Sequence, residues 1–177
     1  MPGIVQDGAA ILRETAIAVP EKLFGSAELT KLVKDMSEAL DHEPEGVALA
    51  APQVSVSWRL FIVRTDRTVN IQPPTDNKEI PKPEPHVEVY INPEIIKTSR
   101  KRASADEGCL SVRGVYGTTK RHERVTLRAQ HIDGKKFQRG ASKLMAQIFE
   151  HEIDHLNGIL FTDHAEHILR IEHAATA

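Results

Sequence analysis

Two histidines near the end of the chain stand where both could bind one metal ion. They belong to the run His151-Glu152-Ile153-Asp154-His155, which places them four residues apart. On an α-helix, residues at i and i+4 lie on one face, so two imidazoles can reach one cation without distorting the backbone. Glu152 lies next to the first histidine and can hydrogen-bond a water molecule there, which is the position of a general base. The spacing therefore favours a metal-dependent hydrolase.

The residues around this motif predict a buried helix from about Ser142 to Leu156, ended by Asn157-Gly158. Much of its circumference is apolar, through Leu144, Met145, Ile148, Phe149, Ile153 and Leu156. Both histidines continue the line of Leu144 and Ile148, so they are expected to point into the core. Imidazoles without partners would be costly there, and a bound cation gives each of them one. The alternative is a charge cluster on the surface of an ordinary helix.

A catalytic metal site normally has three protein ligands and an open position, so a third ligand must come from elsewhere in the chain. Three downstream residues could serve: Asp163, His164 and His167. Upstream, the single cysteine of the chain lies in the run Glu107-Gly108-Cys109-Leu110-Ser111. A thiolate is a strong ligand for Zn²⁺ or Fe²⁺, and the glycine lets the backbone approach closely.

Cys109 has two further interpretations. In a reducing compartment, a lone cysteine can simply be a small buried apolar residue. It can also be a nucleophile, with His151 as its base. The nucleophile hypothesis leaves Glu152 and His155 without a role, so the sequence favours the metal ligand.

Length and charge limit the classes of protein that the chain can represent. With 177 residues, of which 40% are apolar and 27% charged, it fits one globular domain, which we expect to span residues 1–177. The net charge of −2 gives no broad attraction to nucleic acid or to anionic membranes. No apolar run approaches the roughly 20 residues of a transmembrane helix, and the N-terminus lacks the pattern of a secretory signal. We expect a cytoplasmic protein without direct nucleic-acid or membrane binding; a mature organellar form is the alternative.

The N-terminal half predicts one helix and one irregular excursion. Apolar residues recur at helical spacing from Ser26 to Leu40, with Ser26 as the N-cap and an end near His42. Leu60 to Val63 predicts a buried strand. Prolines gather at about residues 64–86, which we interpret as a surface excursion rather than a domain boundary.

The remaining segments predict strands. Apolar residues alternate with polar ones over residues 87–91, which indicates a half-exposed strand ending at Asn92-Pro93. Alternation over residues 125–129, followed by Asp133-Gly134 and a second strand, predicts a hairpin. Residues 164–177 are expected to form a short amphipathic helix or a frayed tail. The expected fold class is α+β, with antiparallel sheets packed around a central buried helix that carries the HExxH motif.

Three segments together resemble the peptide deformylase family: Gly46 to Gln53, Glu107 to Ser111, and His151 to His155 followed by Leu156. They occur in this order, and the similarity extends from about Ile11 to His164. The resemblance implies removal of the formyl group from the N-terminal formylmethionine of newly made polypeptides, with release of formate. It also implies N-formylmethionyl peptides and nascent chains as partners, with transient proximity to the ribosome.

The same resemblance implies the roles of the site residues. Cys109, His151 and His155 would bind one divalent ion, Fe²⁺ in the cell, with Zn²⁺, Ni²⁺ or Co²⁺ able to occupy the site. Glu152 would move the proton between water and the leaving amine. The remaining roles concern the substrate: the oxyanion would be bound by the Gln53 side-chain amide and the Leu110 backbone N–H, and the extended peptide would pair with the backbone at Gly46.

Two positions depart from the commonest pattern of this family. Ala48 stands where a second glycine is usual, and its methyl group could narrow the substrate groove. Glu150 stands where glutamine is usual, and it adds a negative charge four residues from Asp154. Arg121 resembles a position that organises the second motif, and we expect it to pair with Glu107; the alternative is an ordinary solvated arginine.

Two other functions stay open at the level of sequence. A metalloprotease would show endopeptidase activity and a third ligand other than Cys109. A catalytically silent binding module would hold a structural metal in a closed site with four ligands.

Some members of the family that the chain resembles carry a basic terminal helix that acts at the ribosome. Arg170 is the only lysine or arginine after His164 in this sequence, so that role does not transfer.

Overall fold

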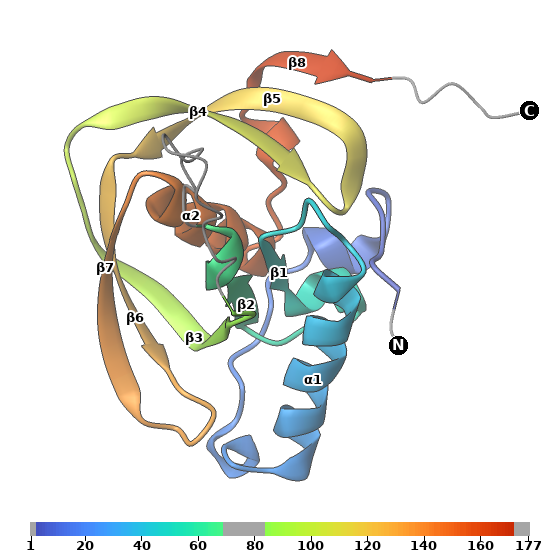
Figure 1. Ribbon diagram of the computed structural model, residues 1–177, viewed down its shortest axis with the longest axis vertical. Helices are drawn as coiled ribbons and strands as arrows, with labels where there is room; N and C mark the ends of the chain where they lie inside the picture. The colour runs from blue at the N-terminus through green and yellow to red at the C-terminus, as the bar shows by residue number, and fades with distance from the viewer. Residues whose placement is uncertain (1–2, 69–83, 172–177) are drawn as a thin grey trace, which may run out of the picture.

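A computed structural model describes residues 3–68 and 84–171, which form two antiparallel sheets and two α-helices (Figure 1). The larger sheet has five strands in the order β1-β2-β3-β6-β7, namely Ala48–Ala50, Leu60–Arg64, Val87–Thr98, Arg124–Gln130 and Lys136–Ser142. The smaller sheet has the order β4-β5-β8, namely Arg102–Cys109, Val112–His122 and Glu166–Arg170. The chain therefore has the expected α+β class.

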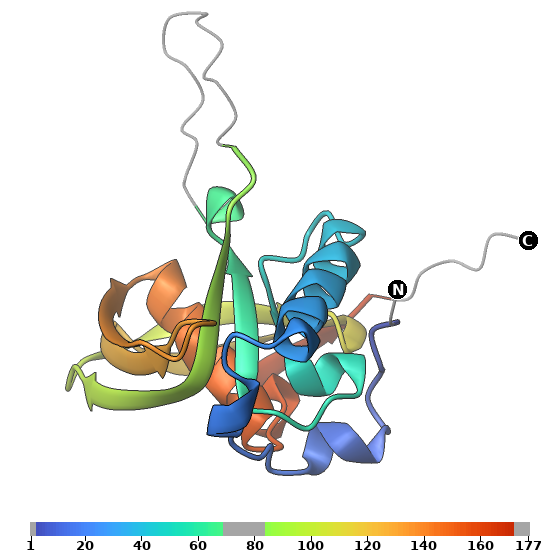
Figure 2. The same cartoon turned by 90° about the horizontal axis from the view of Figure 1, so that it is seen from below.

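The first helix, α1, spans Ala27–Asp41, close to the predicted range. The Ser26 hydroxyl accepts the Leu29 N–H at 3.1 Å, so the predicted N-cap is confirmed. Figure 2 shows α1 (blue) and the β6–β7 hairpin (orange) on opposite sides of β3 (green). Short 3-10 helices connect the larger elements: Ala10–Arg13, Glu21–Leu23, Ala51–Val54, Thr65–Arg67 and Phe161–Asp163.

The second helix, α2, spans Leu144–Leu156 and contains the whole motif His151 to His155. It begins two residues later than predicted, because Ser142 ends β7 and Lys143 has a left-handed φ of 55°. It contacts strands of both sheets, including β1, β5, β6 and β7. Leu144 is 42% exposed rather than buried, because the first turn of α2 lies at the rim of a cleft.

Aromatic rings join α2 to the larger sheet. Phe61 on β2 and Tyr90 on β3 stack with their centroids 4.8 Å apart. The Phe149 ring of α2 meets Tyr90 edge-on at 5.0 Å. These rings are at most 1% exposed, and their packing fixes the face of α2 that is turned away from the sheet.

The predicted end of one strand was wrong, and so was the helix or tail predicted where β8 lies. β3 does not end at Asn92-Pro93 but continues to Thr98, because a bulge between Ile91 and Glu94 accommodates the proline. Asn92 takes a left-handed φ of 49° there. Within the predicted C-terminal helix or tail, Glu166–Arg170 form strand β8, which pairs with β5; residues 172–177 lie outside the described residues.

The structure describes some of the other predicted features. The hairpin is confirmed, since β6 and β7 pair around a turn in which Gly134 has a φ of 84°. The proline-rich excursion lies largely in residues 69–83, outside the described residues. None of the helices that the structure describes is long and apolar enough to cross a membrane.

Candidate metal centre

Cys109, His151 and His155 come together from two elements, strand β4 and helix α2. One donor atom from each lies within 4.8 Å of the others, and Cys109 Sγ is 3.2 Å from His155 Nε2. Helix α2 supplies the two imidazoles at i and i+4. The cysteine ends β4, where a register shift after Gly108 redirects the strand.

The residues fit one divalent ion. Two imidazole nitrogens and a thiolate suit Zn²⁺ or Fe²⁺, and three protein ligands leave a coordination position open. Beside them, the buried Glu152 Oε2 has no hydrogen-bond partner in residues 3–68 and 84–171, and neither has His155 Nδ1, the ring nitrogen that does not approach Cys109. A buried polar atom without a partner costs about 1–3 kcal/mol, so the Glu152 oxygen beside the cluster is better explained by a binding site than by core packing.

Glu107 orients one of the two imidazoles. Its Oε2 lies 2.9 Å from His151 Nδ1, which leaves Nε2 of that ring to face the cluster. Burial opposes ionisation of Glu107, but hydrogen bonds from His151 and Arg121 outweigh it and hold the pKa of Glu107 well below its usual value. The carboxylate therefore stays charged.

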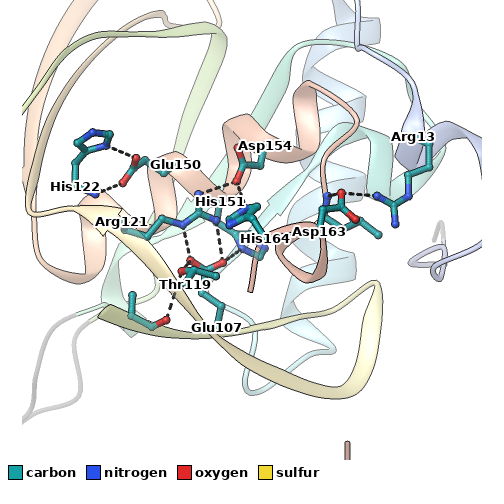
Figure 3. Close-up of polar contacts among 12 residues, drawn as sticks. Arg13, Glu107, Thr119, Arg121, His122, Glu150, His151, Asp154, Asp163 and His164 are labelled. Carbon is teal, nitrogen blue, oxygen red and sulfur yellow. Dashed lines mark hydrogen bonds and ion pairs between the residues drawn. The ribbon is translucent and has the colours of Figure 1, made fainter. Parts of the chain in front are cut away.

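A buried network supports Glu107 in turn (Figure 3). Arg121 donates to both of its carboxylate oxygens, from Nε at 2.6 Å and from Nη2 at 3.0 Å. The predicted Arg121–Glu107 pair is thereby confirmed. Arg121 Nη1 also donates to Asp154 at 2.7 Å, and the Thr119 hydroxyl donates to Glu107 at 2.6 Å. Thr119 was not predicted, although its place two residues before Arg121 on one strand face was a usable signal.

Glu150 has its own partner, so the expected repulsion with Asp154 is compensated. One Glu150 oxygen accepts the His122 backbone N–H at 2.8 Å, and the other lies 2.6 Å from His122 Nδ1. Asp154 binds Arg121 instead and lies 3.2 Å from His164 Nε2. The two carboxylates thus have different partners, His122 for Glu150 and Arg121 for Asp154.

Burial sets the charge of the inward-facing groups. It raises the pKa of Glu152 to about 7, although the charge of His151 acts in the opposite direction. It lowers the pKa of His155 well below its usual value, which favours the neutral imidazole that a metal requires. Glu152 can therefore both accept and release a proton near neutral pH.

The cluster opens into a cleft of about 570 Å³. The predicted site residues at its wall include Gly46, Gln53, Leu110 and Glu152. The Gln53 amide is fixed in place: its oxygen accepts the Ala50 N–H at 2.8 Å and its nitrogen donates to the Ser111 hydroxyl at 3.1 Å. The same nitrogen is 3.7 Å from Cys109 Sγ.

The downstream candidates for a third ligand lie elsewhere. Asp163 pairs with Arg13 at 2.6 Å, and His164 lies beside Asp154. His167 lies on the exposed strand β8. Within the part of the chain that the structure describes, Cys109 is the third member of the only cluster with metal-ligand geometry.

Comparisons with known proteins agree on one family. Residues 1–170 match the family model described as Polypeptide deformylase. A peptide deformylase of Hydrogenovibrio crunogenus is 40% identical over 159 residues, which are 90% of this chain and 82% of that protein. One of Chloroflexus aggregans is 42% identical over 136 residues, 76% of this chain and 71% of that protein. The Met-Ala-Ser-bound crystal structure of class I type b peptide deformylase from Acinetobacter baumannii superposes with a TM-score of 0.77 at 32% identity, covering 92% of this chain and 98% of that one.

Proposed function

This chain belongs to the polypeptide deformylase family and removes the N-formyl group from N-terminal formylmethionine, and we propose that Cys109, His151 and His155 hold the metal on which the reaction depends. The convergence of their three donor atoms within 4.8 Å, beside the buried Glu152, carries the proposal. When bound, a divalent ion supplies Lewis-acid chemistry, acidifying water and polarising the formyl carbonyl. The donor set of one thiolate and two imidazoles suits Fe²⁺ as the ion in the cell, with Zn²⁺, Ni²⁺ and Co²⁺ as substitutes.

Glu152 moves the proton. It accepts one from the attacking water and delivers it to the amine nitrogen that leaves, so the amide bond breaks to give formate and a free amino terminus. A pKa of about 7 suits both halves of this transfer. The Gln53 side-chain amide and the Leu110 backbone N–H donate to the oxyanion that forms on the formyl carbon.

The peptide lies in the cleft beside the backbone at Gly46, and Ile148 of α2 supplies an apolar wall for the methionine side chain. Binding of Met-Ala-Ser by the Acinetobacter baumannii relative supports this use of the cleft. Ala48 also lines the cleft, where its methyl group narrows the groove. Residues 1–177 act as one catalytic domain built around α2, in the cytoplasm, on nascent chains close to the ribosome.

The test is formate release from formyl-Met-Ala-Ser, with acetyl-Met-Ala-Ser as the control and metal quantified in the same preparation. A tight cavity should reject the additional methyl of the acetyl group, so turnover is expected only with the formyl peptide and in proportion to metal content. Equal turnover of the formyl and acetyl peptides would show that the cleft is not specific for the formyl group.

A further inference from the structure

The loop between α1 and β1, residues 42–47, forms one wall of the cleft but lies outside the buried network. It contributes Glu43, Gly46 and Val47 to the cleft lining. A Cβ atom at Gly46 would lie only 2.8 Å from a Leu40 methyl and 3.0 Å from a Leu110 methyl. The loop is therefore packed closely between α1 and the tip of the β4–β5 hairpin, next to Cys109.

One arginine fixes the loop from behind. Nη1 of Arg67 donates to three backbone carbonyls, those of Leu40 at 3.2 Å, Glu43 at 2.9 Å and Gly46 at 2.6 Å. The Leu40 carbonyl lies in the last turn of α1 and the Glu43 carbonyl just beyond the helix end, where i+4 helical partners are lacking. The third carbonyl belongs to Gly46. Arg67 therefore also fixes the position of the backbone segment that lines the cleft.

A second arginine fixes the loop from the side of the metal centre. Arg113, four residues after Cys109, donates to both oxygens of Glu43, at 3.1 Å and 2.5 Å. Such paired contacts fix orientation as well as distance. The Arg113 side chain is 52% exposed and that of Glu43 is 20% exposed, so the pair is accessible to solvent and salt.

We propose that the Glu43–Arg113 pair is a latch that positions the substrate-facing loop against the hairpin carrying Cys109. Both side chains lie at the cleft wall, but in the described residues their hydrogen bonds join them to each other and not to the proposed ligands or Glu152. Both are therefore positioning residues that act through the backbone at Gly46. The proposal rests on the proposed function, in which that backbone binds the formyl peptide. An exposed ion pair is a weak contact, so the latch changes peptide affinity and leaves the chemical step and metal binding alone.

Charge reversal tests the latch. Glu43→Arg and Arg113→Glu each place like charges together, and each should raise KM for formyl-Met-Ala-Ser about 3- to 10-fold with kcat and metal affinity unchanged. The double variant restores an opposite pair and should bring KM back to within about twofold of the wild type. Arg128→Glu is the matched control, because Arg128 forms a similarly exposed pair with Glu94 on the larger sheet; its KM should not move.

Each contrary outcome has a distinct meaning. Unchanged KM in both single variants, or a double variant no better than the singles, overturns the latch. A fall in kcat and metal content that matches the rise in KM also overturns it, because the pair would then support the metal centre. Turnover by the wild type separates the two proposals: its absence overturns the assigned function, whereas its presence with unchanged KM in the variants overturns the latch alone.

Discussion

The two sides of the cleft are held by different kinds of contact. On the side of the metal centre, the side chains of Glu107 and Arg121 are 2% and 8% exposed and share several hydrogen bonds. On the side of the substrate loop, the pair formed by Glu43 and Arg113 is 20% and 52% exposed. Removing one member of a buried pair leaves an uncompensated charge, whereas removing one member of an exposed pair costs little.

The difference matches what each side must bind. A metal ion tolerates deviations of only about 0.2 Å in its ligand distances, so its donors need rigid support from the buried network. A peptide in a cleft is held by many weaker contacts, and a solvent-exposed loop is adequate for that. Substitutions on the two sides should therefore separate ion binding and catalysis from peptide affinity.

The largest effect is expected at Glu152. Replacing Glu152 with alanine removes the proton-transfer group and should lower kcat about 10²- to 10⁴-fold, while metal content stays near one ion per chain. Steady-state formate release together with metal analysis measures both quantities. If Glu152→Ala lost the metal together with activity, Glu152 would be needed for metal binding and not only for proton transfer. Glu166→Ala, on the exposed strand β8, is the control.

Arg121→Met should have the next largest effect. It leaves the carboxylates of Glu107 and Asp154 without their cation, so stability should fall by about 3–5 kcal/mol. Metal affinity should fall about 10- to 100-fold, because Glu107 would no longer hold His151 firmly. Denaturant unfolding and chelator competition measure these changes, with Arg128→Met as the control. If Arg121→Met kept the metal affinity of the wild type, the buried network would not support metal binding, and the proposed difference between the two sides of the cleft would be wrong.

Glu150→Gln should have a smaller effect. A glutamine oxygen can accept one of the two contacts with His122, but the charge of the carboxylate is lost. We expect a loss of about 1 kcal/mol in unfolding free energy, with metal affinity within about twofold of the wild type. If Glu150→Gln lost as much metal affinity as Arg121→Met, Glu150 would also belong to the buried network that supports the metal ligands.

An effect of similar size, but dependent on pH, is expected at Asp66, which lies beside the loop-anchoring Arg67. The hydrogen bond from Arg64 outweighs burial and lowers the pKa of Asp66 to about 2, from an ordinary value of 3.8. Because the folded-state pKa is depressed, this contribution is present above about pH 4 and is lost as the pH falls toward 2. Asp66→Asn should cost about 1 kcal/mol at pH 7, and its difference from the wild type should shrink in urea unfolding between pH 5 and pH 3. A difference independent of pH would contradict this origin.

The sequence predicted those features that depend on local periodicity. The spacing of His151 and His155 on an apolar helix indicated their common face, and Asp133-Gly134 indicated the hairpin. The Arg121–Glu107 pair was also predicted, through resemblance to a family. These features depend on nearby residues or on motifs whose chemistry is specific.

Features that depend on tertiary partners were not predictable. Pro93 suggested the end of a strand, but a bulge formed with β6 carries β3 past it. The C-terminal strand β8 exists because β5 offers an edge to pair with, and nothing within residues 166–170 signals that edge. The contact between Glu43 and Arg113 joins residues 70 positions apart, and single exposed charges carry no signal of their partners.

The most direct test of the metal centre is a Co²⁺ titration of the metal-free protein, followed by absorption spectroscopy. A thiolate ligand gives an intense near-ultraviolet charge-transfer band, and cobalt reports its own coordination. We predict a band that saturates at one equivalent in the wild type and in Glu152→Ala, and that is absent in Cys109→Ser. A wild-type protein that binds Co²⁺ without this band, or a Cys109→Ser variant that retains it, would contradict the proposed ligand set.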